Sequence, residues 1–462
     1  MQSTARNLRA DAEAIWQAGL AAVKSDAAVR EAVRVVGRNL VVGEQLFDLD
    51  AVRKIVVVGA GKAGAGMAAG LESALGPGVI REKKVGGWVN VPADCVRKLE
   101  TIQLHAARPA GRNEPTPEGV AGTEEILRLV SQCDERDLVI ALISGGGSAL
   151  LPAPIAAISL AEKQAITRFL SAAGANIHEL NTVRKQLSRI KGGGLARACR
   201  AGHLVVLILS DVIGDPLSII ASGPTVPDDG TPGGALAILE RFGARRSGIA
   251  PAAIEYLEQK ASSTSDHSQG LTQPPSCEVI NLVIANNALA VDAAGIRAES
   301  LGYSHAMIAA RGQEPTAEEV GRHLARMALR MRSEPGPDCL ITGGEPTVKL
   351  ADEAIRGRGG RNQQLVLAAY LELLAATPAG SDPLAGICLL SGGTDGEDGP
   401  TDAAGAMLDS EIAASAAALG LDPHDALRRN DAYTFFQRCD GLLQTGPTHT
   451  NVCDVRVVVV RR

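Results

Sequence analysis

The chain has 462 residues, more than one hydrophobic core usually serves, so two domains are the first expectation. Its 45% hydrophobic and 21% charged residues describe an ordinary soluble globular protein, and aromatics at only 2% imply an aliphatic core. The net charge of −6 leaves no electrostatic footprint for nucleic acid, and no apolar run reaches the length of a membrane span.

Cysteine usage and the N-terminus favour a cytoplasmic protein. The eight cysteines show neither a C-x-x-C motif nor metal-ligand spacing, so we expect reduced, buried thiols. The opening residues, Met-Gln-Ser-Thr-Ala-Arg, lack the apolar segment of a secretory signal. We expect neither nucleic acid nor a membrane among the partners.

The first half of the chain predicts a parallel α/β domain. Apolar positions at helical spacing predict an amphipathic helix over residues 8–23. From residue 54 onward, apolar strands alternate with alanine-rich helices, and continuous apolar strands of this kind form parallel sheets covered on both faces. We therefore expect a Rossmann-like, doubly wound, mostly parallel sheet in a domain of residues 1–258. The strands are predicted at 54–58, 87–91, 138–143 and 203–209, and the helices at 62–75, 117–129, 160–173 and 177–188.

The second half predicts a smaller α/β domain of residues 277–462. Turn-forming residues without periodicity at 259–276 predict a linker or surface loop before it. Beyond the linker, strands are predicted at 279–284, 304–309, 339–342, 387–391 and 455–460, and helices from 287, over 316–331 and from 362. Ligands of open α/β sheets bind beyond the carboxyl ends of strands, which is where the glycine-rich segments of both halves fall.

A glycine turn with a lysine follows the first predicted strand. The segment from Gly59 through Gly61 to Gly64 fits G-x-G-x-x-G and opens a helix, which raises dinucleotide binding. The acidic residue expected at the end of the next strand is absent, since Asn90 stands there. The turn is not a Walker A loop either, because Lys62 is followed by Ala63. A phosphate- or substrate-directed Lys62 and a structural turn with an exposed lysine both stay open.

A glycine triplet flanked by hydroxyls follows the strand predicted at 138–143. Consecutive glycines let the backbone approach a ligand closely, and the hydroxyls add donors. The competing interpretation is a tight strand–helix turn without a ligand. The candidate binding residues are Ser144, Gly145, Gly146, Gly147 and Ser148.

Two aspartates follow the strand predicted at 203–209. Asp211 is a candidate general base or metal ligand, and Asp215 is a tentative metal ligand. The alternative for Asp215 is a helix cap.

A basic helix precedes the glycines at 192–194. Arg184 and Lys185 belong to it and are candidates for recognising phosphate or carboxylate, although such charge runs are usually solvated faces.

The second half carries a comparable set of polar residues. A glycine–arginine loop precedes a predicted helix, and glycines free its arginines to fold over a carboxylate or phosphate. Asp395 is a candidate Mg²⁺ ligand, with a solvated acidic loop as the competing interpretation. The candidate ligand-binding residues of this half are Glu345, Arg358, Arg361, Ser391, Gly392, Gly393 and Thr394.

These segments together resemble the glycerate 2-kinase family, the class II glycerate kinases whose C-terminal half is called the MOFRL domain. The resemblance implies a second domain of α/β/α type and phosphorylation of D-glycerate by ATP at the 2-hydroxyl, with Mg²⁺, in a cleft between the two domains. It also implies that Lys62 and Arg361, with Arg358 second, are important for activity. We name a homodimer as the candidate assembly. The matching segments are residues 59–63, 144–151, 181–185, 209–216, 221–225, 343–347, 359–363, 391–396 and 443–452, in the family's order.

One segment departs from the family pattern. The family usually has a Gly-His-Pro-x-Pro-Asp loop where this chain reads Ala107-Arg108-Pro109, which puts affinity or specificity in doubt if the loop touches a ligand. Some relatives carry an older label of hydroxypyruvate reductase, an NAD(P)H-dependent enzyme, and this is the alternative activity. A non-catalytic protein that binds sugar acids or phosphates is the third class, which turnover of ATP would separate.

Overall fold

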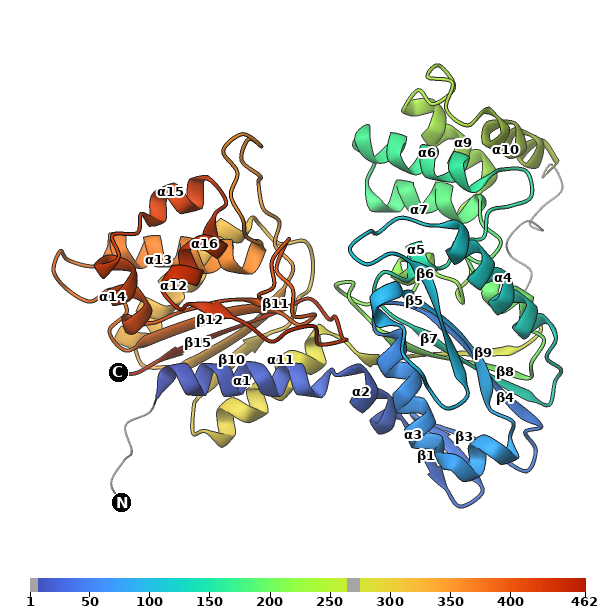
Figure 1. Ribbon diagram of the computed structural model, residues 1–462, viewed down its shortest axis with the longest axis horizontal. Helices are drawn as coiled ribbons and strands as arrows, with labels where there is room; N and C mark the ends of the chain where they lie inside the picture. Colours follow the sequence, from blue (N-terminus) through green and yellow to red (C-terminus); the bar gives the residue numbers. More distant parts are fainter. Residues whose placement is uncertain (1–6, 264–274) are drawn as a thin grey trace. The chain divides into compact units, whose positions relative to one another are not determined.

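The computed structural model describes residues 7–263 and 275–462, and the chain forms two compact units (Figure 1). Unit I is Ser25–Ile284, and unit II joins Met1–Lys24 to Ala285–Arg462. Most of the linker predicted at 259–276 lies outside the described residues, and its first residues continue helix α10 (Pro251–Ser263).

The two units differ from the predicted domains at two places. Helix α1 (Leu8–Ala22) belongs to unit II, because its Trp16 side chain is fully buried and Trp16 Nε1 lies 3.4 Å from the Gly392 carbonyl oxygen. Strand β9 (Glu278–Ala285), predicted as the start of the second domain, is instead the edge of the sheet in unit I. The backbone N–H of Glu278 donates to the Gly202 carbonyl at 3.0 Å. The first helix of the chain therefore packs in the second unit, and the strand after the linker still belongs to the first unit.

Unit I is built on a six-stranded sheet with the order β6-β5-β4-β7-β8-β9. The five strands from β4 to β8 pair in parallel, which confirms the predicted Rossmann-like sheet. The order reverses direction between β4 and β7, so the crevice beyond their carboxyl ends is the expected ligand position. The strands are β4 (Lys54–Ala60), β5 (Gly86–Pro92), β6 (Ile102–Arg108), β7 (Asp137–Ile143) and β8 (His203–Leu209).

Helices cover both faces of this sheet, as the wholly buried strand β7 requires. Helices α4 (Pro117–Ser131) and α8 (Gly194–Ala198) complete one apolar core, and α3 (Gly64–Glu82) packs against β5 and β7. Helix α2 (Ser25–Ala32) lies on α3. The sequence did not predict the small antiparallel sheet of β1 (Val33–Val36), β2 (Asn39–Val42) and β3 (Gln45–Asp48).

Four further helices of unit I form a separate helical group with its own apolar core. They lie together at one end of the unit, near the short helix α5 (Gly147–Leu150) (Figure 1). The single-turn η1 (Ala93–Cys95) and η2 (Ile220–Ser222) complete unit I. The helical group comprises α6 (Leu160–Ala172), α7 (Ile177–Gln186), α9 (Pro232–Arg241) and α10.

Unit II is an α/β/α sandwich around a mixed sheet of order β10-β11-β15-β12-β13-β14. Only β10 and β11 are parallel, since β15 runs antiparallel between β11 and β12. The strands are β10 (His305–Ile308), β11 (Cys339–Gly344), β12 (Ile387–Gly393), β13 (Gly405–Leu408), β14 (Leu442–Leu443) and β15 (Asp454–Val460).

The helices of unit II lie on the two faces of that sheet (Figure 1). Helices α1 and α11 (Asn287–Ser300) pack together on one face, and α12 (Ala317–Ser333) and α13 (Arg361–Ala376) pack together on the other. Three short helices follow, α14 (Ser410–Ala418), α15 (Pro423–Arg428) and α16 (Ala432–Arg438). Across the described ranges, none of the helices combines the length and apolarity needed to cross a bilayer.

Candidate functional site

Two glycine turns interlock at the switch point of the sheet in unit I. The turn after β4 and the loop after β7 exchange backbone hydrogen bonds, from Lys62 N to the Gly145 oxygen at 2.9 Å and from Ser144 N to the Ala60 oxygen at 3.1 Å. The Ser144 hydroxyl is 1% exposed and accepts the N–H of Ala63 at 3.1 Å. Ser144 therefore ties the two turns together with its side chain directed into the protein.

Glycine is required at both turns for physical reasons. Gly61 has φ 153°, and a methyl group there would lie 1.9 Å from the Ser144 hydroxyl oxygen. Gly146 has φ 74°, in the left-handed region that glycine adopts without strain. The backbone N–H groups of Gly145 and Gly146 have no hydrogen-bond partner within the described chain. Two adjacent free donors on a glycine loop suit an anionic ligand.

Two cationic side chains meet over Gly146. A methyl group placed on Gly146 would lie 3.3 Å from Arg108 Nη2 and 3.6 Å from Lys62 Cγ. Lys62 is half-buried, whereas Arg108 is only 4% exposed. Burial lowers the pKa of the Arg108 guanidinium, which the charge of Asp94 offsets only in part. The loop that departs from the family pattern thus reaches the glycine loop.

Asp211 lies beside the same loop, at the carboxyl end of β8. A methyl group on Gly145 would lie 2.2 Å from Asp211 Oδ2, so the carboxylate sits directly against the loop backbone. Asp215 follows in a tight turn with φ 53°, and its N–H donates to the Val212 carbonyl at 3.0 Å. Of the two predicted aspartates, Asp211 is the one that lies at the glycine loop.

A lysine from outside the sheet holds the far end of the glycine loop. Lys191 is 2% exposed, and its Nζ donates to the Ser148 hydroxyl at 2.7 Å and to the Ser148 carbonyl at 2.8 Å. The Ser148 and Ser222 hydroxyls lie 3.0 Å apart, and Ser222 donates to Asn181 at 3.1 Å. Ser148 is therefore part of a buried polar network as well as of the loop.

The helical group adds further cations near Lys191. Burial lowers the pKa of Lys191 well below its usual range, and the charges of Lys163 and Arg184 add to the effect. Burial likewise lowers the pKa of Lys163 to about 7 and lowers the pKa of Arg184. No acidic group forms an ion pair with these three residues among the residues that the structure describes. Unit I therefore brings three buried basic side chains without acidic partners close together, and their burial favours the neutral form.

Lys185 lies on the same helix but has a different role. Its ammonium group forms a buried ion pair with Asp228 at 2.8 Å. The structure thus satisfies Lys185 internally, in contrast with Arg184.

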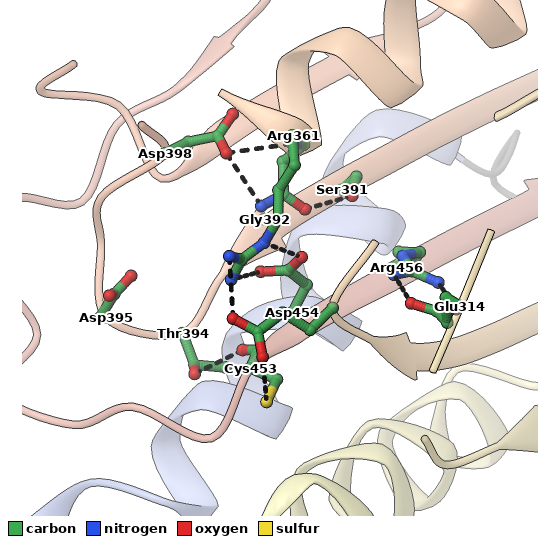
Figure 2. Close-up of polar contacts among 12 residues, drawn as sticks. Glu314, Arg361, Ser391, Gly392, Thr394, Asp395, Asp398, Cys453, Asp454 and Arg456 are labelled. Atoms are coloured by element: carbon green, nitrogen blue, oxygen red, sulfur yellow. Dashed lines mark hydrogen bonds and ion pairs between the residues drawn. The ribbon is translucent and has the colours of Figure 1, made fainter. Parts of the chain in front are cut away.

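Unit II gathers its predicted residues around Arg361, the first residue of α13 (Figure 2). The Arg361 fork binds both carboxylate oxygens of Asp454, at 2.7 and 2.9 Å, and Arg361 Nη1 lies 3.0 Å from Glu345. Burial alone would lower the pKa of Arg361, but the carboxylates of Asp454 and Glu345 outweigh it and raise the pKa. Asp454 is fully buried, so most of the Arg361 fork serves to neutralise it.

Asp398 fixes the N-terminus of α13. Its carboxylate accepts the N–H groups of Asn362 and Gln363, at 3.0 and 2.8 Å. Burial raises the pKa of Asp398 to about 7 although these two donors favour the charged form. Figure 2 shows Asp398 at the start of the helix that carries Arg361.

The residues at the end of β12, and Thr394 after it, make contacts within the fold. Ser391 is buried and donates to the Asn362 side chain at 2.5 Å, and Thr394 is buried and donates to the Cys453 carbonyl at 2.7 Å. A methyl group on Gly392 would lie 2.6 Å from the Leu443 side chain. Gly393 N donates to the Ala404 carbonyl at 2.8 Å. The predicted ligand-binding role of these four residues stays a prediction.

Two other predicted residues of unit II lie nearer the surface. Arg358 is exposed and stacks on the Tyr433 ring, with Cζ 4.6 Å from the ring centroid. Asp395 is half-buried, and its carboxylate accepts the N–H of Glu397 at 3.2 Å. In residues 7–263 and 275–462, no group of three or more His, Cys, Asp or Glu residues could hold a metal ion.

Strand β15 supplies a second buried charge pair of unit II. Asp454 and Arg456 are two residues apart, so their side chains share a face of the sheet. Arg456 is 1% exposed and binds Glu314 through both terminal nitrogens, at 2.8 and 2.7 Å (Figure 2). The half-buried fork of Arg361 and the buried fork of Arg456 thus both hold carboxylates.

Sequence reasoning missed several residues of both clusters. Lys163 and Asp454 carried no motif, and Arg108 stood out only as part of the segment that departs from the family pattern. Lys191 was visible only as one charge in a basic run.

Comparisons with known proteins agree with this architecture. Two family profiles match the chain, a domain of unknown function, DUF4147, at residues 11–258 and the MOFRL family at residues 338–454. A glycerate kinase from Danio rerio is 38% identical, over 98% of this chain and 98% of the relative. A protein from Agrobacterium vitis named putative hydroxypyruvate reductase is 39% identical, over 88% of this chain and 99% of the relative.

Solved structures give the same result. A crystal structure of glycerate kinase from Thermotoga maritima matches with a TM-score of 0.81 and 33% identity, over 98% of this chain and 99% of that chain. The identity and the coverage of both chains are high enough to establish kinship along the whole sequence. The chain therefore belongs to the glycerate kinase family.

Proposed function

We propose that this protein is a glycerate kinase that transfers the terminal phosphate of ATP to the 2-hydroxyl of D-glycerate, giving 2-phosphoglycerate and ADP. One observation carries the proposal: interlocked glycine turns at the switch point of the sheet, with free N–H groups and unpaired cations around them. Both substrates are anions, and phosphoryl transfer depends on positioning and neutralising their charge. The relatives named glycerate kinase support the same conclusion.

The residues of unit I divide into anion-binding and proton-accepting roles. The N–H groups of Gly145 and Gly146 and the Lys62 ammonium bind phosphate or carboxylate oxygens. The glycerate hydroxyl oxygen bonds to the terminal phosphorus, and the bond from phosphorus to the bridging oxygen of ADP breaks. The hydroxyl proton passes to the Asp211 carboxylate, which lies against Gly145.

A magnesium ion in this protein would be held by single carboxylates. Mg²⁺ is commonly held by one or two carboxylates together with substrate phosphates and water, so it does not need a cluster of three acids. Asp215 in unit I and Asp395 in unit II are the candidate ligands, which leaves the Asp211 carboxylate to accept the hydroxyl proton. When bound, the ion neutralises charge on the phosphates.

In unit II, Arg361 contributes through its pairing with Asp454 and Glu345. Arg361 binds Asp454 with two of its nitrogens and Glu345 with the third, and the Glu345 side chain is 45% exposed. We propose that Arg361 orders Glu345 for ligand binding, with Arg358 as an exposed second arginine.

The test is a coupled ADP-release assay with purified protein, Mg-ATP and D-glycerate, with L-glycerate as the stereochemical control. We expect ADP release that depends on D-glycerate. A parallel arm measures oxidation of NADH or NADPH with hydroxypyruvate, because one relative is named for that reductase. Robust oxidation with no ATP turnover would refute the kinase.

The structure also bears on the reductase alternative. A dinucleotide fold normally places an acid at the end of the second strand to bind the ribose. Asn90 stands there, is fully buried, and donates its side-chain amide to the Leu150 carbonyl at 2.8 Å. The Trp88 indole donates to the same side chain at 3.1 Å. These internal contacts favour a kinase over a nicotinamide enzyme.

Location and assembly complete the proposal. Seven of the eight cysteines are buried and all eight are free thiols, which supports a reducing compartment such as the cytoplasm.

Strand β10 is a sheet edge with exposed apolar residues, Met307 at 45% and Ile308 at 55%. Exposed apolar edges of sheets pair with other chains. We therefore propose a homodimer. Light scattering of the wild type and of the Ile308→Lys variant tests this assembly.

A further inference from the structure

Arg108 is a buried arginine without a charge partner. Its side chain is 4% exposed, and its Nε has no hydrogen-bond partner. Its Nη1 donates to the backbone carbonyl of Arg112. No carboxylate forms an ion pair with Arg108 anywhere in the described chain, and Asp94 acts on it only at longer range. The guanidinium is therefore desolvated without a counter-charge.

Three cations of this chain are compensated by acids, whereas Arg108 is not, like Lys163, Arg184 and Lys191. Lys185 pairs with Asp228, Arg361 with Asp454, and Arg456 with Glu314. Burying a charge is costly unless an opposite charge or several hydrogen bonds compensate it. The stability of the fold therefore does not explain why the Arg108 guanidinium is buried without a partner.

The position of Arg108 supplies that explanation. Arg108 is the last residue of β6, and its Nη2 points to the space over Gly146, beside the Lys62 side chain. Gly146 has no side chain to fill that space, and its N–H is one of the two free donors of the loop. A planar guanidinium presents paired donors that match the oxygens of carboxylates and phosphates.

We propose that Arg108 is a substrate-binding residue, whose guanidinium binds an anionic oxygen over Gly146 together with Lys62. The oxygen belongs either to the carboxylate of the acid substrate or to a phosphate of the nucleotide. The inference rests on the proposed function for the identity of these ligands. Burial lowers the pKa of Arg108, and an anion at this position would restore its preference for the charged form.

The test measures binding of each ligand separately, by titration calorimetry with D-glycerate alone and with Mg-ATP alone. The variants are Arg108→Gln, which removes the charge, and Arg108→Lys, which keeps it without the fork. Arg112→Gln is the matched control, because it removes the charge of an exposed arginine of the same loop. We expect Arg108→Gln to weaken one ligand at least 10-fold, while Arg112→Gln changes neither more than 2-fold. The ligand that weakens identifies carboxylate or phosphate as the source.

A stability measurement separates binding from folding. Because Arg108 has no counter-charge, ligand-free Arg108→Gln is expected to melt at the same temperature as the wild type or higher. Wild-type affinity of Arg108→Gln for both ligands would overturn the proposal. If Arg108→Gln does not fold, Arg108→Lys decides: weaker binding of one ligand supports the proposal, and wild-type binding of both overturns it.

Failure of the proposed function gives a different result. A wild type that releases no ADP refutes the kinase, whereas the calorimetric titrations still compare anion binding between Arg108→Gln and Arg112→Gln. Inorganic phosphate as a third titrant provides an anion that depends on neither substrate.

Discussion

At the scale of single residues, Lys62 has the position expected of a ligand-binding cation. Its backbone N–H is anchored to Gly145, and its half-buried side chain extends over Gly146. Lys62→Ala should lower kcat/KM at least about 100-fold, because a charge-assisted contact to an anion contributes about 2–3 kcal/mol. Steady-state kinetics of the purified variant check this.

The control for Lys62 is Lys98→Ala, which removes an exposed lysine of unit I. It should leave turnover unchanged, and both variants should melt within a few degrees of the wild type. Near-normal turnover in folded Lys62→Ala would assign Lys62 to the glycine turn alone.

Asp398 makes stability depend on pH in a definite direction. Burial raises its pKa from 3.8 to about 7, so the folded chain retains the proton at pH values where the unfolded chain has lost it. The resulting stabilisation is complete below about pH 4 and is lost as the pH rises through 7. Relative to Asp398→Asn, which cannot ionise, the wild type should lose roughly 2–3 kcal/mol of unfolding free energy between pH 5 and pH 8.

Denaturant unfolding of both proteins at the two pH values measures that change. A difference between wild type and Asp398→Asn that is the same at pH 5 and pH 8 would show that Asp398 is ionised throughout, with the two N–H donors of α13 outweighing burial.

The candidate site was predictable where the sequence carries a motif and not where it depends on burial. Gly61, Lys62 and the loop from Ser144 follow apolar strands directly, so chain position alone located them. Sequence alone did not show that the Ser144 hydroxyl faces inward or that Asp454 occupies the Arg361 fork. These outcomes depend on which strands are neighbours in the folded sheet.

At the scale of elements, the glycine loop after β7 allows the backbone strain of a substitution to be distinguished from its effect on ligand binding. Gly146→Ala and Gly174→Ala both place a side chain at positive φ, 74° and 84° respectively. Each should lose about 1–2 kcal/mol of stability, the usual strain of a left-handed residue. A methyl group on Gly174 meets nothing within 4 Å, whereas one on Gly146 enters the space between Arg108 and Lys62.

Turnover should therefore differ between Gly146→Ala and Gly174→Ala, although the two variants should be similarly stable. Kinetic and thermal measurements on both are the check, and we expect only Gly146→Ala to lose turnover, by at least about 10-fold, since a misplaced anion loses optimal contacts with its donors. Equal activity of the two variants would mean that the space over Gly146 is not used.

Elements of strong periodicity were predictable and short ones were not. Strand β8 has the predicted bounds, and α4 and α12 differ from prediction by one or two residues, because long apolar runs and stripes define them. The four-residue strands β1–β3 and the two-residue β14 are too short for a pattern. The antiparallel insertion of β15 into the sheet of unit II depends on pairing across about 60 to 120 residues.

At the scale of the whole molecule, the first helix belongs to the last unit. Helix α1 buries Ile15, Trp16 and Leu20 in unit II. Residues 285–462 alone would expose the apolar surface that these side chains cover, and full burial of such side chains contributes about 1.5–3 kcal/mol each. The fragment should therefore unfold at lower temperature and less cooperatively than the same fragment joined to residues 7–24.

Calorimetry of the two fragments measures this, with Trp16→Ala in the joined fragment as the control for packing. Equal melting temperatures with and without residues 7–24 would show that α1 only lies on unit II without stabilising it.

The most direct test of the kinase is the chemical identity of its product. Phosphorus NMR of a reaction with D-glycerate and Mg-ATP resolves ADP and the two phosphoglycerate isomers in one spectrum. The account predicts that ADP and 2-phosphoglycerate appear in equal amounts, and that Asp211→Asn slows both together. Phosphorylation at the 3-hydroxyl, or ADP formed without any phosphoglycerate, would contradict it.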